Sequence, residues 1–193
     1  MVVVIDTSSV RAGIAVLTPG GEVAAESVRE SARDLDLAAA VRELVDLHRL
    51  TQVVCATGPG SFTGLRLGAA FAVGLAMGLG IPLGGLPTLE LAAARAREPA
   101  RGVAEAGRGR VYFQGDGGAP QLGEAAQVPR DRPVSGWLRP ATALALAEAG
   151  VRLLAEDELR SFGEAAGRLL GDARNLDYNG VELEYVQSFG PLR

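Results

Sequence analysis

The sequence predicts an α/β protein built from two packed halves. Short, almost continuously apolar runs at residues 2–5 and 52–56 are typical of strands that are covered on both faces of a sheet. They alternate with longer segments in which apolar residues recur every three or four positions, as in amphipathic helices. Residues 98–102 (EPARG) form a seam, after which this pattern weakens. A chain of 193 residues, 48% of them apolar, is long enough to bury a substantial core.

The first half opens with a predicted three-stranded meander. The apolar run at 2–5 is the first strand, and residues 10–17 and 22–28 are the second and third, joined by a hairpin turn at 18–21 (TPGG). Asp34 can cap a helix that follows the meander and continues to about residue 50.

A long helix without charge after its first turn follows the strand at 52–56. Ser61 is a favourable N-cap for a helix over 62–79, and no charged residue occurs between Arg66 and Glu90. Two rows at four-residue spacing contain mostly small residues: one is Gly64, Gly68, Ala72, Ala76 and Gly80, and the other is Arg66, Ala70, Gly74 and Gly78. Such rows let a neighbouring helix approach closely. The helix is therefore either a core helix of this chain alone or one that also offers a face to another protein.

The rest of the chain has weaker signals. A short strand at 81–86 and a helix over 88–97 complete the first half. Beyond the seam we expect a strand at 111–114, a turn at 115–118, and a stretch at 119–136 that is rich in turn formers. Helices from about residues 141 and 159 and a last strand at 181–187 follow.

Composition excludes several classes of protein. The chain has no lysine, which rules out the Walker A phosphate loop and every mechanism that needs an active-site lysine. Its net charge of −4 offers no overall basic field for nucleic acid. The single cysteine, Cys55, excludes a disulfide framework and favours a cytoplasmic location. Glycines and prolines from Gly78 to Pro87 interrupt the uncharged run, so we expect no membrane span, and the N-terminus does not resemble a signal peptide.

Common catalytic and metal-binding patterns fail on spacing. Gly58, Gly60 and Gly64 give G-x-G-x-x-x-G, one residue longer than the dinucleotide fingerprint. Ser61 is not flanked as a nucleophile elbow, and the single histidine, His48, precedes it in the chain. One histidine and one cysteine do not supply a zinc site. We therefore expect no catalytic residue and no metal ligand in this chain.

A remnant nucleotide cleft is the one ligand site that the pattern permits. Asp6, Thr7 and Ser8 follow the first strand, and Gly58, Gly60 and Ser61 lie between a later strand and a helix. Ligands of open α/β sheets bind outside the carboxyl ends of strands, and helix N-termini favour anions. The alternative is that these residues only cap turns.

In its motifs the sequence resembles the TsaB family, the noncatalytic subunits of the bacterial machinery that makes threonylcarbamoyl-adenosine beside the tRNA anticodon. The resemblance depends on residues 4–8 (VIDTS), on the eleven-residue motif at 58–68 (GPGSFTGLRLG), and on 81–83 (IPL) and 86–89 (LPTL). It covers the chain through about residue 98.

The resemblance implies an actin-like, ribonuclease-H-like fold with mixed sheets and helices on both faces. It divides the chain into an N-terminal half, 1–98, and a shortened C-terminal half, 99–193. It further implies a scaffold that binds the related glycoprotease-like subunit TsaD and, with it, the ATPase TsaE, and that acts on tRNA through this complex. No cofactor of its own is expected, since ATP or ADP and a metal ion belong to the partner subunits. Alone, the chain is expected to form a homodimer. The alternative is a stand-alone ATP-binding transferase or hydrolase that uses Asp6 and the glycine turn.

The same resemblance places the partner interface on two helices of the first half, the helix capped by Asp34 and the long helix over 62–79. The residues expected there on the long helix are Thr63, Gly64, Arg66, Leu67, Ala70, Phe71, Gly74 and Gly78. The chain departs from the family pattern at 105–107 (EAG), where the family often has Asp-Ala-Arg, and at 183–187 (LEYVQ), where it often has Pro-x-Tyr-Leu-Arg.

Overall fold

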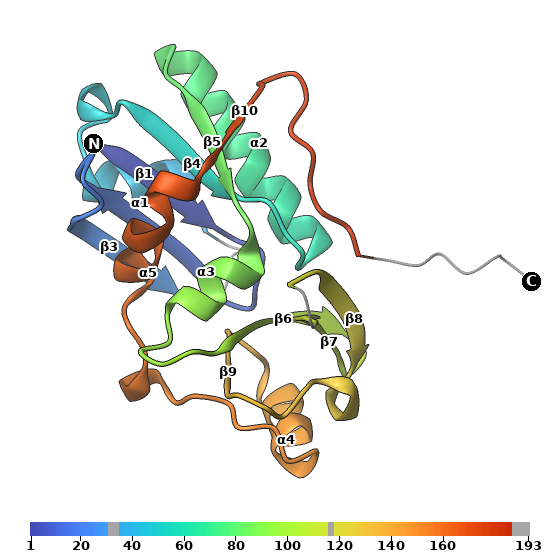
Figure 1. Ribbon diagram of the computed structural model, residues 1–193. Helices are drawn as coiled ribbons and strands as arrows, with labels where there is room; N and C mark the ends of the chain where they lie inside the picture. The colour runs from blue at the N-terminus through green and yellow to red at the C-terminus, as the bar shows by residue number, and fades with distance from the viewer. Residues whose placement is uncertain (31–34, 116–117, 187–193) are drawn as a thin grey trace, which may run out of the picture.

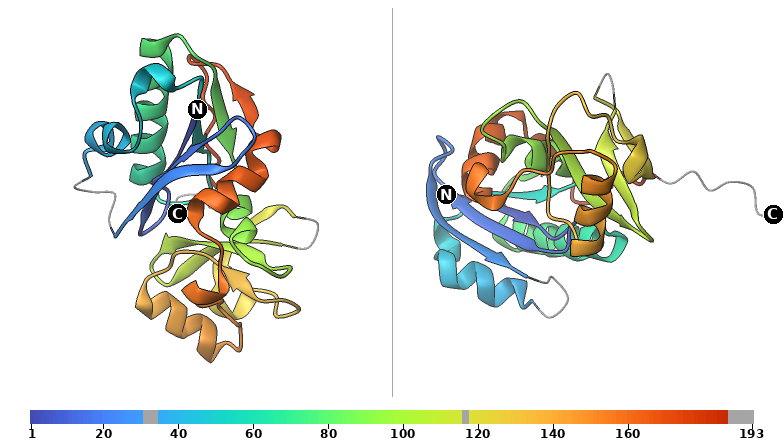
Figure 2. Two further views of the ribbon diagram at one scale, coloured as in Figure 1. Left: turned by 90° about the vertical axis from the view of Figure 1, so that its left-hand side faces the viewer. Right: turned by 90° about the horizontal axis from the view of Figure 1, so that it is seen from below.

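Two sheets form two lobes of the molecule, with a helix at their junction (Figures 1 and 2). The structure is a computed structural model that describes residues 1–30, 35–115 and 118–186. The first sheet has six strands in the order β10-β5-β4-β1-β2-β3, and the second has four in the order β8-β7-β6-β9. The expected α/β fold in two packed halves is confirmed.

The first sheet combines a meander with a parallel centre. Its strands are β1 (Val2–Asp6), β2 (Ala12–Leu17), β3 (Val23–Arg29), β4 (Gln52–Ala56), β5 (Leu83–Leu86) and β10 (Arg174–Leu176). β1 pairs antiparallel with β2, and β2 with β3, while β1, β4 and β5 are parallel. In this mixed sheet the antiparallel strands β1, β2 and β3 adjoin the parallel strands β4 and β5, and β10 pairs antiparallel with β5 at the far edge. This is the ribonuclease-H-like arrangement that was expected.

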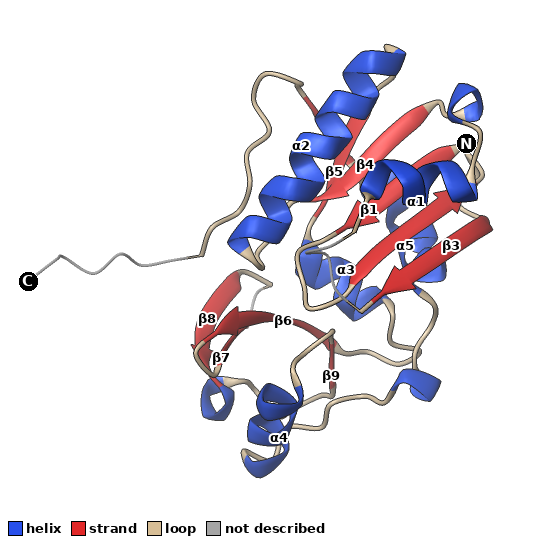
Figure 3. Ribbon diagram, turned by 180° about the vertical axis from the view of Figure 1, so that it is seen from behind, coloured by secondary structure: helices blue, strands red, loops and turns tan. Residues whose placement is uncertain are grey.

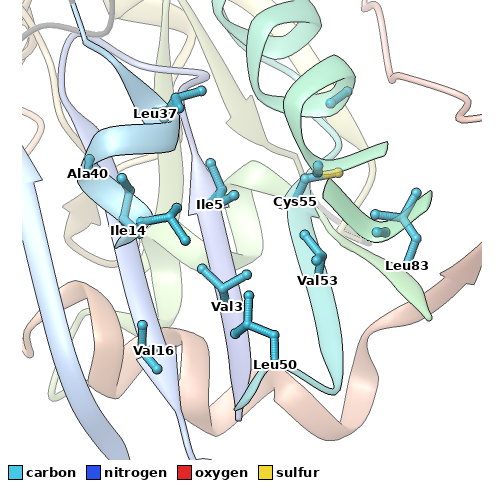
Figure 4. Close-up of a cluster of buried hydrophobic side chains, with 14 residues drawn as sticks. Val3, Ile5, Ile14, Val16, Leu37, Ala40, Leu50, Val53, Cys55 and Leu83 are labelled. Carbon is cyan, nitrogen blue, oxygen red and sulfur yellow. The ribbon is translucent and has the colours of Figure 1, made fainter. Parts of the chain in front are cut away.

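Helices cover both faces of this sheet, as Figure 3 shows. α1 (Leu37–Leu44) and α2 (Phe62–Leu79) lie on one face, where Val3, Ile5 and Cys55 meet them in one buried cluster (Figure 4). α3 (Thr88–Ala94) and α5 (Phe162–Leu169) cover the other face, over Val2 and Val4. Alternate residues of β1 therefore point into two different cores, which is why its sequence is apolar without interruption.

The second lobe is a smaller sheet with one helix of its own. Its elements are β6 (Arg101–Gly107), β7 (Arg110–Gln114), β8 (Pro120–Glu124), β9 (Val134–Ser135) and α4 (Pro140–Glu148). α4 packs on one face of the sheet through Leu146, and α3 reaches the other face, where Leu89 contacts Ala104 and Tyr112. Short 3₁₀ turns lie at Leu47–Arg49, Ala125–Gln127, Glu156–Glu158 and Leu170–Asp172.

The chain returns to the first sheet after the second lobe. α5 packs on β2 and β3, and β10 pairs with the edge strand β5. Residues that follow residue 98 in sequence therefore complete the first lobe. The division of the chain into 1–98 and 99–193 stays a prediction.

Three sequence-based boundaries differ from the structure. The N-cap of α1 is Asp36, whose Oδ1 accepts a hydrogen bond from the amide of Ala39 at 2.9 Å, while Asp34 lies outside the described residues. α1 ends at Leu44 because Val45 is extended and Asp46 caps a separate 3₁₀ turn. Within the predicted strand at 181–187, the described residues 181–186 pair with no strand, and the last strand is β10.

Strands β6 and β8 were missed because polar side chains interrupt their pattern. In β6 the buried Glu105 accepts hydrogen bonds from the amide of Arg139 and from Thr142 Oγ1, and so caps the N-terminus of α4. A carboxylate inside a strand is stabilised here by a helix that follows it 35 residues later. Local periodicity does not reveal such a contact.

Candidate functional site: the glycine turn and the exposed face of α2

The glycine turn joins β4 to α2 and is built from backbone hydrogen bonds. Gly58 has φ of 109°, a conformation that glycine adopts without strain, and its carbonyl oxygen accepts from the amide of Thr88 at 2.8 Å. Ser61 is the N-cap of α2, and its Oγ accepts from the amide of Gly64 at 3.3 Å. The cap predicted from the sequence is confirmed.

The loop after β1 packs directly on this turn. The amide of Ser61 donates to the carbonyl oxygen of Ser8 at 2.7 Å, and Thr7 Oγ1 donates to the carbonyl oxygen of Gly64 at 2.7 Å. A Cβ at Gly60 would lie 2.5 Å from the oxygen of Ser8, and one at Gly64 would lie 1.9 Å from the oxygen of Thr7. These two glycines of the motif are therefore required by the close approach of the two loops.

Asp6 is the buried acid at the centre of these contacts. Its Oδ1 accepts from the amide of Ser8 at 2.8 Å and from Ser8 Oγ at 2.5 Å. Burial raises the pKa of Asp6, and the two hydrogen bonds from Ser8 lower it in part. Asp6 thus holds the loop that follows β1.

The structure brings all six residues of the predicted cleft together, but it leaves little space beside them. The cavity next to Asp6 has a volume of about 20 Å³, whereas ligand pockets for nucleotide-sized molecules measure several hundred Å³. A wider depression of about 570 Å³ lies at the opposite end of the first sheet, and none of its lining residues is charged. The geometry favours the alternative in which the loop residues cap and join turns.

The two rows of small residues on α2 have opposite environments. Gly64, Gly68, Ala72 and Ala76 are buried against the first sheet, whereas Arg66, Ala70, Gly74 and Gly78 are exposed. Gly80, the last member of the first row, is the C-cap of α2 and is exposed. Thr63 and Leu67 are exposed as well, and Phe71 is half-buried. Seven of the eight predicted interface residues therefore reach the surface. Gly64 is the exception, because the carbonyl oxygen of Thr7 covers it.

Large apolar side chains add to this surface. Phe62 is 52% exposed, Leu67 39% and Met77 55%, and all three belong to α2. The ring of Tyr185, which is 43% exposed, contacts the ring of Phe62 with centroids 5.3 Å apart and planes inclined by 43°. Phe62 and Met77 are missing from the interface predicted from the sequence, although Phe62 precedes Arg66 by four residues and Met77 follows Gly74 by three. Nothing local to Tyr185 indicates that it lies here.

We define the α2 face as Phe62, Thr63, Arg66, Leu67, Ala70, Gly74, Met77 and Gly78. By length and composition α2 is the one helix among the described residues that is apolar enough to cross a membrane. A single helix of this kind is weak evidence for a span, since the core helix of a globular domain passes the same test. Here the opposite side of α2 lies on the first sheet.

The single cysteine and the single histidine of the chain lie in opposite environments. Cys55, on β4, is buried in the core beneath α2, and burial together with the nearby charge of Asp6 raises the pKa of its thiol to about 12. His48 is exposed in the 3₁₀ turn after α1. Across the described part of the chain, no three His, Cys, Asp or Glu side chains are grouped as a metal site would need.

The family model and the curated relative that the chain resembles are both described by one tRNA modification, the threonylcarbamoylation of adenosine. The family model described as "TsaD: tRNA N6-adenosine threonylcarbamoyltransferase" matches residues 16–131. The chain is 35% identical over 121 residues to the "tRNA threonylcarbamoyladenosine biosynthesis protein TsaB" of Bacillus subtilis (strain 168). The match covers 58% of this chain and 52% of the relative, so the chain spans about half the length of this curated relative.

Solved structures agree over almost the whole chain. The fold is similar to that of YeaZ from Pseudomonas aeruginosa, with a TM-score of 0.73 and 20% identity over 96% of this chain and 99% of the other. A second structure from the same organism, an uncharacterized protein with similarity to peptidase YEAZ, gives a TM-score of 0.71 with the same identity and coverage. At 20% identity, the similarity to these two structures shows the fold alone.

Proposed function

The chain belongs to the protein family described as "TsaD: tRNA N6-adenosine threonylcarbamoyltransferase". We propose that within this family it is a TsaB protein, a noncatalytic scaffold subunit, as the similarity to the Bacillus subtilis TsaB supports. It binds a TsaD protein, and with it TsaE, in the cytoplasmic complex that threonylcarbamoylates the adenosine next to the anticodon of tRNA. ATP or ADP and the metal ion reside in the partner subunits. Alone, the chain forms a homodimer through the same surface.

The observation that carries this proposal is the pair of glycines on the α2 face. Glycine in a helix interior costs about 1 kcal/mol relative to alanine. A Cβ at Gly74 or at Gly78 would meet no atom within 4 Å, and neither residue has a positive φ. This chain's own packing therefore gives no reason for glycine at either position. A helix of a partner that approaches α2 closely supplies one, because small residues let two helix axes come near each other.

The character of the surface supports the same conclusion. Phe62, Leu67 and Met77 supply exposed apolar area beside the glycines, and apolar area gathered on one helix is typical of a protein interface. The noncatalytic role is supported by the burial of Asp6 and Cys55, the side chains that a reaction would otherwise employ. A scaffold acts by linkage: it binds only the competent conformation of TsaD and so raises the population of that conformation.

The test is co-elution of purified variants with the TsaD protein of the same source. Gly74→Trp and Ala70→Trp place a bulky side chain on the α2 face and are expected to abolish co-elution and to slow tRNA modification in the reconstituted system. Leu144→Trp is the matched control, since Leu144 is 59% exposed on α4, away from the α2 face. Unchanged co-elution of both α2 variants would refute the placement of the interface. Magnesium-dependent ATP turnover by the isolated chain, lost in Asp6→Ala, would instead support the stand-alone enzyme.

A further inference from the structure

The C-terminal segment 177–186 returns from β10 to the N-terminal end of α2, and Figures 1 and 3 show it running beside that helix. Tyr178 donates a hydrogen bond from its hydroxyl to the carbonyl oxygen of Ile81. The amide of Glu184 donates to the carbonyl oxygen of Thr57 at 2.8 Å. Val181 and Leu183 are half-buried on the core between the first sheet and α2. The segment is thus docked by its backbone and by alternate side chains.

Tyr185 makes a different kind of contact from these docking residues. It remains 43% exposed, and its ring lies on Phe62 of α2. Arg66 Nε donates to its hydroxyl oxygen at 3.4 Å, and the Arg66 guanidinium carbon lies 3.9 Å from the centroid of the Phe62 ring. A residue 119 positions later in the sequence therefore completes a cluster with two residues of the α2 face.

Arg66 is the only charged residue of α2, and it begins the exposed row that contains Gly74 and Gly78. Its guanidinium stacks on Phe62 while Tyr185 holds its Nε, so two sides of this long side chain are restrained. Within the described residues its terminal Nη1 and Nη2 atoms have no hydrogen-bond or ion-pair partner. A guanidinium with its two terminal nitrogens free matches the geometry of a carboxylate. Restraint before binding reduces the entropy that is lost when the pair forms.

We propose that Tyr185 is a positioning residue for partner recognition: with Phe62 it orients Arg66 so that the guanidinium pairs with a carboxylate of the partner chain. The inference depends on the proposed function, because it takes the TsaD protein as the partner on the α2 face. It adds the chemistry of recognition at one end of that face, and it makes the C-terminal segment part of the binding surface. Apolar contact along the glycine row alone leaves the register of two helices weakly specified, whereas a single buried charge pair fixes it.

The experiment measures the dissociation constant for the TsaD protein by titration calorimetry, using the full chain. Tyr185→Ala is expected to weaken binding about three- to tenfold, the effect of losing the preorganisation of one long side chain. Tyr185→Phe is expected to retain most of the affinity, because the ring contact persists and the lost hydrogen bond is long. Glu182→Ala changes an exposed residue of the same segment and is the matched control.

A double-mutant cycle separates positioning from a merely structural role. If Tyr185 acts through Arg66, the variant Arg66→Ala/Tyr185→Ala binds no more weakly than Arg66→Ala alone. Arg66→Lys keeps the charge but lacks the planar fork, and it is expected to lose most of the effect of the arginine. Thermal unfolding of each variant, compared with that of Glu182→Ala, shows whether the fold is retained.

The possible outcomes distinguish the two proposals. If the unaltered chain does not bind the TsaD protein, the proposed function fails. If Ala70→Trp abolishes binding while Tyr185→Ala leaves the dissociation constant unchanged, the interface stands and this inference is wrong. Tighter binding by Tyr185→Ala would overturn it too, because the segment would then compete with the partner, and additive losses in the double variant would exclude action through Arg66.

Discussion

Glycines of α2 are expected to respond in opposite directions to the same substitution. Gly64 lies on the buried row, where an added Cβ would be 1.9 Å from the carbonyl oxygen of Thr7. Gly74 lies on the exposed row, where the added Cβ meets no atom within 4 Å. Gly64→Ala and Gly74→Ala therefore add the same methyl group to one helix in two contrasting environments.

The size of each effect follows from the contacts. At Gly74 alanine removes the glycine penalty, so the free energy of unfolding should rise by about 0.5–1 kcal/mol. At Gly64 the two loops must separate by roughly 1.5 Å before the contact becomes ordinary, and overpacking of this kind costs about 1–3 kcal/mol. The separation also breaks the buried 2.7 Å hydrogen bond from Thr7 Oγ1 to the Gly64 carbonyl oxygen, which costs about 1–3 kcal/mol more. Less the helix gain, the expected loss is about 3 kcal/mol.

The assay is urea denaturation followed by circular dichroism and by the fluorescence of the single tryptophan, Trp137. Thermal melting is the second measurement. For a chain of this size, a change of 1 kcal/mol in the free energy of unfolding shifts the melting temperature by about 2–4 °C. Gly64→Ala should therefore melt about 6–12 °C below the unaltered chain. Gly78→Ala is a second exposed control and should behave like Gly74→Ala. If Gly64→Ala proved as stable as the unaltered chain, the close contact of the two loops, and the reason given for the motif glycines, would be wrong.

Further predictions concern three buried groups. The pKa of Asp6 is raised in the folded chain above its usual value of 3.8, so the folded state binds more protons than the unfolded state between the two values. The free energy of unfolding should then fall as pH rises from about 4 through the folded pKa, and a pH series on Asp6→Asn should lack that fall. Cys55, with its pKa raised to about 12, should react with a thiol reagent at pH 8 only in step with unfolding, and rapid labelling of the folded chain would contradict its burial. Glu105→Ala should lower the free energy of unfolding in urea by about 1–2 kcal/mol through loss of the α4 cap, whereas the exposed Glu148→Ala at the other end of α4 should not.

Local patterns predicted most of the first lobe. β1, the β2–β3 hairpin, β4, α2 and α3 all occur where periodicity, turn residues and the Ser61 cap place them. Asp34 and Asp36 are both suitable N-cap residues for α1, and the local sequence gives no reason to prefer Asp36. The second lobe was less predictable, because β6 contains a carboxylate whose partner is a later helix. Strand β10, three residues long, forms only because the edge of β5 is available to pair with it.

The candidate site, like the fold, was predicted only in part from the sequence. The glycine-rich motif, the two rows of small residues and the absence of charge after Arg66 are all evident in the sequence, and they were enough to predict the helix. The motif also carries much of the resemblance to the TsaB family. Tertiary structure decided which row is buried, because Thr7, in the loop after β1 and 57 residues before Gly64, covers that glycine. It also decided that Tyr185 contacts Arg66. Residues that are three and four positions apart lie on the same face of a helix, so the sequence alone determines which residues share a face. Which face remains open depends on segments that meet only after folding.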